Sequence, residues 1–237
     1  MFQSIDLLSI FKQLTFYRQV NTSDSPAFAE AARKTYLRDT ISAVMNHDLL
    51  LESISKHIHL EDEELQHFLS YIQVKKVQKK QYLLMEGEVN RSAMFVASGC
   101  LKSYYLDENG SQYIQQFAPE GWWVVDMYSF IMQEPGHLYI DALFDSKLLL
   151  ISKINLEKLY REIPKFNYYF RILAEKSLVS FQTRAMENLR LTAKERYEKF
   201  CLRYPSLIDR LSQKQVAAYI GVTPEFLSKM LHTAHES

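Results

Sequence analysis

The last segment of the chain, residues 211–231, has the pattern of two short helices joined through a glycine. Ser212 is a residue type that caps the beginning of a helix, and Gly221 can adopt the left-handed conformation that ends one. Thr223 then caps a second helix that has Pro224 at its first position. The pattern predicts a helix-turn-helix, the unit that lays its second helix in the major groove of DNA.

Helix pairs joined by a glycine also occur in helical domains that bind no DNA, so this pattern alone leaves both interpretations open. Ala217 and Ala218 are small residues at the point where the two helices must approach closely, which favours the helix-turn-helix. From residue 192 to the end, seven Lys and Arg stand against five Asp and Glu. This segment therefore has a weak basic bias.

The composition is that of an ordinary folded protein with no global charge. The chain has 237 residues, of which 47% are hydrophobic and 24% charged, and its formal net charge is zero. Any contact with nucleic acid must therefore come from a local patch. Two distant cysteines, Cys100 and Cys201, argue against a disulfide framework, a zinc module or an iron–sulfur cluster, and they fit the cytoplasm. Charged residues interrupt residues 1–20, so we expect neither a signal peptide nor a membrane span.

The middle of the chain, residues 74–152, consists of short runs of β-branched, aromatic and aliphatic residues separated by turn signals. The sharpest of these signals is Asn109-Gly110, because both residues tolerate positive φ. It predicts a hairpin between residues 101–106 and 111–117. Turns spaced by about 10 to 12 residues favour a sandwich or roll over a parallel sheet.

Helical periodicity lies on both sides of this β-rich segment. We divide the chain into a helical extension (1–44), the β-rich module with flanking helices (45–163), one long helix (164–191) and the helix-turn-helix domain (192–237). One face of the long helix would pack on the module, and another could pair with the same helix of a second subunit. A core helix within a monomer has the same periodicity, so the pattern does not separate the two arrangements.

The order of β-roll, long helix and helix-turn-helix resembles the Crp/Fnr family of bacterial transcription regulators. The matching motifs are residues 82–88, 94–101, 107–110, 117–122, 148–152 and 211–231. The resemblance implies an α+β fold. Its parts are an N-terminal cyclic-nucleotide-binding-like β-roll similar to a double-stranded jelly roll, a long dimerisation helix and a C-terminal helix-turn-helix. Because six residues follow Leu231, we expect the two-stranded wing of the family to be absent.

In this family the roll holds a cyclic nucleotide through a Gly-Glu element at the ribose and an Arg-Ser pair at the phosphate. Val125 and Asp126 stand at the first position here, and Gly136 and His137 stand at the second. Without the arginine a cyclic phosphate loses its charged bidentate partner, so cAMP is not the expected effector. The resemblance assigns a candidate ligand pocket to Gly121, Asp126, Gly136, His137, Gln182 and Thr183. The alternative is that these are surface residues of a vestigial pocket.

The family's reading helix often presents Arg-Glu-x-x-x-Arg to the bases, and the corresponding residues here are Pro224, Glu225 and Lys229. Glu225 can accept from a cytosine amino group, Lys229 can reach guanine or a phosphate, and Phe226 can touch a thymine methyl. Losing the first arginine predicts a different half-site. The candidate DNA-binding residues are Ser212, Gln213, Thr223, Glu225, Phe226, Ser228 and Lys229. Those with hydroxyl or amide side chains would contact phosphates, or would act only as caps or solvated helix residues.

These observations favour a homodimeric, cytoplasmic transcription regulator that binds a near-palindromic site in double-stranded DNA. RNA polymerase and a small-molecule effector of unknown identity are further partners that the resemblance implies. The alternative is a β-roll module that regulates a protein partner without binding DNA. We find no catalytic constellation, metal site or cofactor motif, so we do not expect an enzyme.

Overall fold

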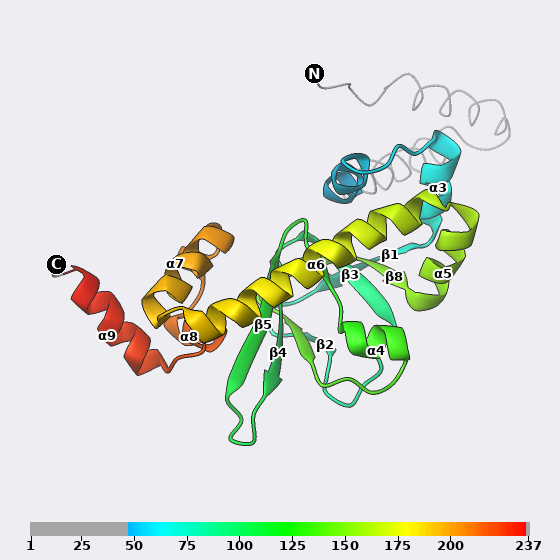
Figure 1. Ribbon diagram of the computed structural model, residues 1–237. Helices are drawn as coiled ribbons and strands as arrows, with labels where there is room; N and C mark the ends of the chain where they lie inside the picture. The colour runs from blue at the N-terminus through cyan, green and yellow to red at the C-terminus, as the bar shows by residue number, and fades with distance from the viewer. Residues whose placement is uncertain (1–46, 236–237) are drawn as a thin grey trace, which may run out of the picture. The chain divides into compact units, whose positions relative to one another are not determined.

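The computed structural model describes residues 47–235 (Figure 1). The predicted helical extension, residues 1–44, lies outside the described residues. Residues 47–55 are helical, and α3 (Asp62–Ser70) leads into the first strand. Helix α3 begins with a capping box in which the side chains of Glu61 and Glu64 bond each other's backbone N–H.

Two four-stranded antiparallel sheets form the β-roll. In the first sheet the order is β1 (Ile72–Val77), β8 (Ser146–Ser152), β3 (Ser92–Ser98) and β6 (Trp123–Val124). In the second sheet it is β2 (Tyr82–Leu84), β7 (Tyr139–Ala142), β4 (Cys100–Leu106) and β5 (Gln112–Pro119). Apolar residues of both sheets, such as Val96 and Leu148 from the first and Leu101 and Ile140 from the second, form one buried cluster between them. The β-roll and the α+β class are thus confirmed.

The predicted hairpin joins β4 to β5. Gly110 takes a φ of +75° at the turn, and the Asp107 carboxylate accepts hydrogen bonds from the backbone N–H groups of Asn109 (2.9 Å) and Ser111 (2.8 Å). The side chain of Asp107 therefore replaces backbone partners that the turn lacks. The second strand begins at Gln112, one residue later than the sequence predicts, and continues to Pro119.

Three helices follow or interrupt the strands: α4 (Met127–Met132), α5 (Lys153–Glu162) and α6 (Lys165–Arg190). The 26-residue helix α6 is the predicted long helix, and it runs along the roll toward the C-terminal helices (Figure 1). Its first turns bury Phe166 and Tyr169 in a core that they share with α3, β3, β8 and α5. This packing fixes the beginning of α6 on the roll.

The C-terminal part consists of α7 (Ala193–Arg203), a 3-10 turn (Ile208–Arg210), α8 (Gln213–Ile220) and α9 (Pro224–His235). The predicted caps are in place: Ser212 forms a capping box with Gln215, and Gly221 ends α8 with a φ of +74°. Thr223 caps α9 by accepting a hydrogen bond from the N–H of Phe226 (3.2 Å). Helices α8 and α9 form the predicted helix-turn-helix, whereas α7 and the 3-10 turn were not predicted. After the role that the sequence predicts for it, we refer to residues 192–235 as the DNA-binding unit.

Candidate DNA-binding site and ligand region

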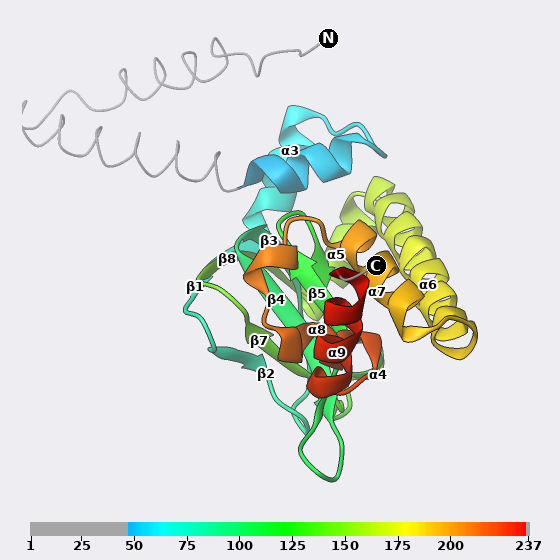
Figure 2. The same ribbon diagram turned by 90° about the vertical axis from the view of Figure 1, so that its left-hand side faces the viewer.

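Helix α9 has one buried and one exposed side. Leu227 is fully buried against the rest of the DNA-binding unit, and Met230 is half-buried. Glu225, Phe226 and Lys229 are exposed, and positions four apart on a helix share a face. A carboxylate, an aromatic ring and an ammonium group therefore lie together on the outer face of α9. Figure 2 shows helix α9 in front of α8.

The other predicted DNA-contact residues divide into caps and surface residues. The Ser212 hydroxyl accepts from the N–H of Gln215 (3.3 Å), so it acts as the cap of α8. Thr223 likewise caps α9. Gln213 is exposed in the first turn of α8, whereas Ser228 is half-buried. A hydroxyl that accepts as a cap still has an O–H that can donate to a phosphate oxygen, and the O–H of Ser212 now donates to Gln215 Oε1 (3.0 Å). Phosphate contacts at these four positions stay a prediction.

Sequence reasoning overlooked His232, which is exposed on α9 three positions after Lys229. The spacing i, i+4, i+7 from Glu225 through Lys229 could have found it, because these positions fall on one face of a helix. An imidazole there extends the polar outer face of α9 by one further turn.

The candidate ligand region around α4 is organised by Asp126, which is 4% exposed. Its carboxylate caps α4 by accepting from the N–H of Ser129 (3.1 Å), and its second oxygen accepts from the N–H of Leu138 (3.4 Å). A Cβ on Gly136 would lie 2.3 Å from that second oxygen, so the backbone of residue 136 closes over the carboxylate. Both oxygens of Asp126 are thus engaged within the loop.

The remaining residues of the predicted pocket lie in separate environments. His137 is exposed, with its ring 6.3 Å from that of Tyr128. Gly121 forms a turn with a φ of +84° and donates its N–H to the carbonyl of Val96 (2.9 Å). Gln182 and Thr183 are exposed on the second half of α6.

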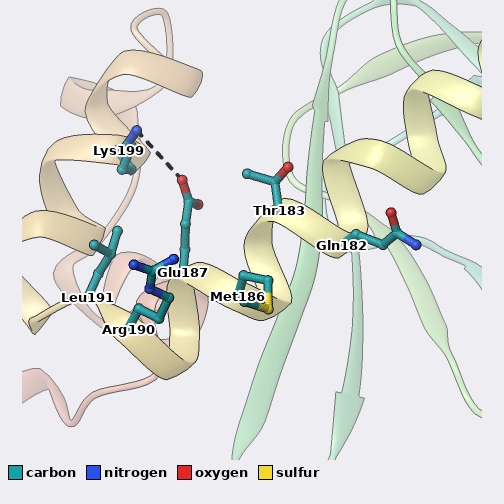
Figure 3. Close-up of a pocket in the computed structure, with 7 residues that line it drawn as sticks. All are labelled: Gln182, Thr183, Met186, Glu187, Arg190, Leu191 and Lys199. Carbon is teal, nitrogen blue, oxygen red and sulfur yellow. Dashed lines mark ion pairs between the residues drawn. The ribbon is translucent and has the colours of Figure 1, made fainter.

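Gln182 and Thr183 line an open groove of about 580 Å³ between α6 and α7 (Figure 3). The other lining residues are Met186, Glu187, Arg190, Leu191 and Lys199. An ion pair of 3.7 Å joins the carboxylate of Glu187 to the ammonium group of Lys199 across it. The groove includes neither Asp126 nor His137 in its lining, so a ligand pocket shared by all six predicted residues stays a prediction.

Aromatic residues fill the seam between the roll and the first half of α6. Trp123 packs edge-on against Phe95 and Phe170, with ring centroids 5.3 and 5.5 Å apart. Its indole N–H donates to the hydroxyl of Tyr169 at 3.2 Å. Ring contacts and one hydrogen bond thus join the side chains of this seam.

A buried polar cluster lies on the outer face of the second sheet. The Asp141 carboxylate accepts from the Tyr104 hydroxyl (3.2 Å) and lies 3.5 Å from the ammonium group of Lys102. Burial raises the pKa of Asp141, and the charge of Lys102 opposes that rise. Sequence reasoning missed this cluster because nothing local marks residues 102 and 141 as neighbours; the pairing of β4 with β7 brings them together.

Among residues 47–235, no helix is both long and apolar enough to cross a membrane, and no three acidic, histidine or cysteine side chains group in a way that could hold a metal ion. What the described structure does present is a β-roll, a long helix and a helix-turn-helix with an exposed outer face. This combination is the architecture expected of transcription regulators with a roll-type N-terminal domain.

Comparisons with known proteins agree with this class. Residues 74–162 match the family model of the cyclic nucleotide-binding domain. The regulatory protein HlyX of Actinobacillus pleuropneumoniae is 27% identical over 186 residues, which cover 73% of this chain and 76% of that protein. The anaerobic regulatory protein of Haemophilus influenzae is 25% identical over 224 residues, covering 86% of this chain and 83% of that protein.

A solved structure with the same fold is that of the c-di-GMP responsive global regulator CLP of Xanthomonas campestris. It has a TM-score of 0.63 at 15% identity, and the match covers 74% of this chain and 92% of that one. At this identity the likeness shows the fold alone. The domain match and the named relatives show that the chain is similar to transcription regulators of the Crp/Fnr type.

Proposed function

We propose that this protein is a homodimeric, sequence-specific DNA-binding transcription regulator of the cytoplasm, with promoter DNA and RNA polymerase as partners. The observation that carries the proposal is the outer face of α9, where Glu225, Phe226 and Lys229 are exposed while Leu227 is buried. A carboxylate that accepts from cytosine and an ammonium group that reaches guanine or phosphate are the groups that read a major groove.

The second half of α6 supports the homodimer. Its exposed large apolar side chains are Leu178, Val179, Phe181, Met186 and Leu189. A helix that leaves such residues in water gains by pairing with a second copy, because burying one leucine contributes about 1.5 to 3 kcal/mol. Two copies of α9 in such a dimer would bind half-sites about one helical turn apart.

We further propose that the signal controlling this protein is not cAMP. Gly136 and His137 stand where the family's Arg-Ser pair is expected, so the phosphate lacks a guanidinium partner. The carboxylate of Asp126, which would take the ribose, is occupied by the N–H groups of Ser129 and Leu138. A cyclic nucleotide would have to displace these bonds and would gain no charged contact in return.

The test is DNA binding by fluorescence anisotropy, with promoter-region duplexes measured at several salt concentrations. Replacing Lys229 by alanine is expected to lower the slope of log affinity against log salt by about 1, and Glu225→Ala to weaken discrimination by about 1 to 3 kcal/mol. Lys158→Ala is the matched control, because Lys158 is exposed on α5 rather than on the DNA-binding unit. Unchanged salt dependence and discrimination in both variants would contradict DNA reading by α9, and the lack of any specific complex at low salt would favour a β-roll module that acts on a protein partner.

A further inference from the structure

The DNA-binding unit packs directly on the roll. Phe117 of β5 lies among Phe200, Tyr204 and Tyr219 of the DNA-binding unit, with ring centroids 6.3, 5.6 and 5.6 Å away. All four are buried in one apolar cluster that also includes Cys100 of β4. Helix α8 lies against β5 in both views (Figures 1 and 2). The unit is therefore held by the second sheet as well as by its covalent link to α6.

A β-bulge in β5 lies next to this contact. Ser103 pairs with Gln116 and Tyr104 pairs with Ile114, so Gln115 is the extra residue on its strand. A bulge breaks the regular ladder and leaves local carbonyl groups free to bond elsewhere. The carbonyls of Ile114 and Gln115 both accept hydrogen bonds from the guanidinium group of Arg184, which lies on α6.

The same guanidinium group also holds α8. It donates to the carbonyl of Tyr219 at 2.8 Å, and its central carbon lies 3.9 Å from the centroid of the Tyr219 ring. Tyr219 is in the last turn of α8, where carbonyls lack helical partners and a positive charge is favoured. One side chain of α6 thus bonds β5 and α8 at once, and we refer to these three hydrogen bonds as the Arg184 clamp.

We infer that the Arg184 clamp is a regulatory device that sets the position of the DNA-binding unit on the roll. It rests on the proposed function in one respect: the position matters because α9 reads DNA. A movement of the β4–β5 hairpin breaks the shared hydrogen bonds and releases the unit, so a change in the roll is passed to α8 while the long helices keep their spacing. The planar guanidinium suits this task because its donors point in several directions, whereas a lysine offers one point charge.

Cys100 supplies a probe of the clamp. The chain has two cysteines, so in a Cys201→Ala background Cys100 is the sole thiol. Its side chain is 0% exposed within the cluster that the DNA-binding unit covers, and burial raises its pKa to about 12. A thiol reagent can therefore modify Cys100 only in molecules that have opened, and the labelling rate measures the population of the open state.

The experiment compares labelling rates of the full chain carrying Arg184→Gln with those of Arg171→Gln. Arg171 lies on the same helix and pairs with Glu175 on the surface, so it is the matched control. Losing charge-assisted hydrogen bonds is expected to speed labelling of the Arg184→Gln protein by about tenfold or more, with the control within about twofold of the parent. Labelling of Arg184→Gln at the parent rate would overturn the inference.

A second variant covers the case in which Arg184→Gln fails to fold. Arg184→Lys keeps the charge but removes the planar fork whose separate nitrogens donate to β5 and α8, so labelling faster than the parent supports the clamp and labelling at the parent rate contradicts it. Because no DNA is present in these measurements, their failure would leave the anisotropy test of the proposed function intact, and the reverse also holds.

Discussion

The two halves of α6 both carry large apolar side chains, but their surroundings differ. In the first half Phe166 and Tyr169 are completely buried in the core that α6 shares with the roll. In the second half Leu178 is 58% exposed and Leu189 is 83% exposed. One helix can thus serve two interfaces in succession: one with its own roll, and a second that we propose it forms with another copy.

The largest effect is expected when one phenylalanine in each half of α6 is replaced by alanine, which tests whether the two halves differ in burial. Phe166→Ala opens a cavity in the core, where Phe166 stacks on Phe68 at 4.6 Å, and is expected to lower the free energy of unfolding by about 3 to 5 kcal/mol. Phe181→Ala, in protein dilute enough to be monomeric, is expected to lower it by less than about 0.5 kcal/mol because Phe181 is exposed. Urea unfolding measures both, and equal losses would refute the division of α6.

The second half is tested by self-association. If α6 pairs with a second copy, Leu178→Ala weakens the dimer by about 1.5 to 3 kcal/mol, which raises its dissociation constant about tenfold to a hundredfold. Analytical ultracentrifugation gives this constant. Ile154→Ala is the control, because Ile154 is 70% exposed on α5 rather than α6. A parent protein that stays monomeric at every concentration would contradict the proposed dimer.

A smaller effect is expected from the hydroxyl of Tyr169, which lies 3.0 Å from the Ser53 hydroxyl and accepts from the Trp123 N–H. Tyr169→Phe leaves that N–H unpaired and is expected to lower the free energy of unfolding by about 1 to 2 kcal/mol at neutral pH.

The same variant has a predicted pH dependence. Burial raises the pKa of Tyr169, so the hydroxyl stays protonated in the folded state at pH values where the unfolded chain, with a pKa of about 10, has lost the proton. The stability that this group contributes is complete below pH 10 and is lost as the pH rises through the folded-state pKa. The gap between parent and Tyr169→Phe should therefore narrow in urea titrations above pH 10, and a gap that widens would contradict the assignment.

The smallest effect is expected at the surface of α6. Arg171 and Glu175 form an ion pair one turn apart, and both side chains are more than half exposed. Arg171→Gln is expected to change the free energy of unfolding by less than about 0.5 kcal/mol, since water and salt screen such pairs. A larger loss in urea unfolding would mean that this part of α6 is covered in solution.

The features that the sequence predicts are the local ones. Ser212, Gly221 and Thr223 mark the helix ends of the DNA-binding unit because caps and left-handed turns depend on a few neighbouring residues. Asp126 was assigned to a ligand by resemblance, although the spacing from Asp126 to Ser129 also suits a helix cap, the role it has in the structure.

Contacts between distant segments could not be predicted in this way. The Arg184 clamp depends on a one-residue bulge in β5 and on the docking of α8, about 70 and 35 residues away along the chain. No local pattern of charge or periodicity predicts that residues this far apart in the sequence come into contact. The polar outer face of α9 was predictable because it follows helical spacing, whereas the surface on which the unit docks was not.

Selection of bound sequences from a library of randomised DNA duplexes measures directly whether this protein reads DNA. If paired copies of α9 read DNA, the enriched duplexes will share a near-palindromic site whose half-sites lie about 10 base pairs apart, and Glu225→Ala will change the bases preferred within each half. Failure to enrich any shared sequence, or enrichment that Glu225→Ala and Lys229→Ala leave unaltered, would contradict DNA reading by paired copies of α9.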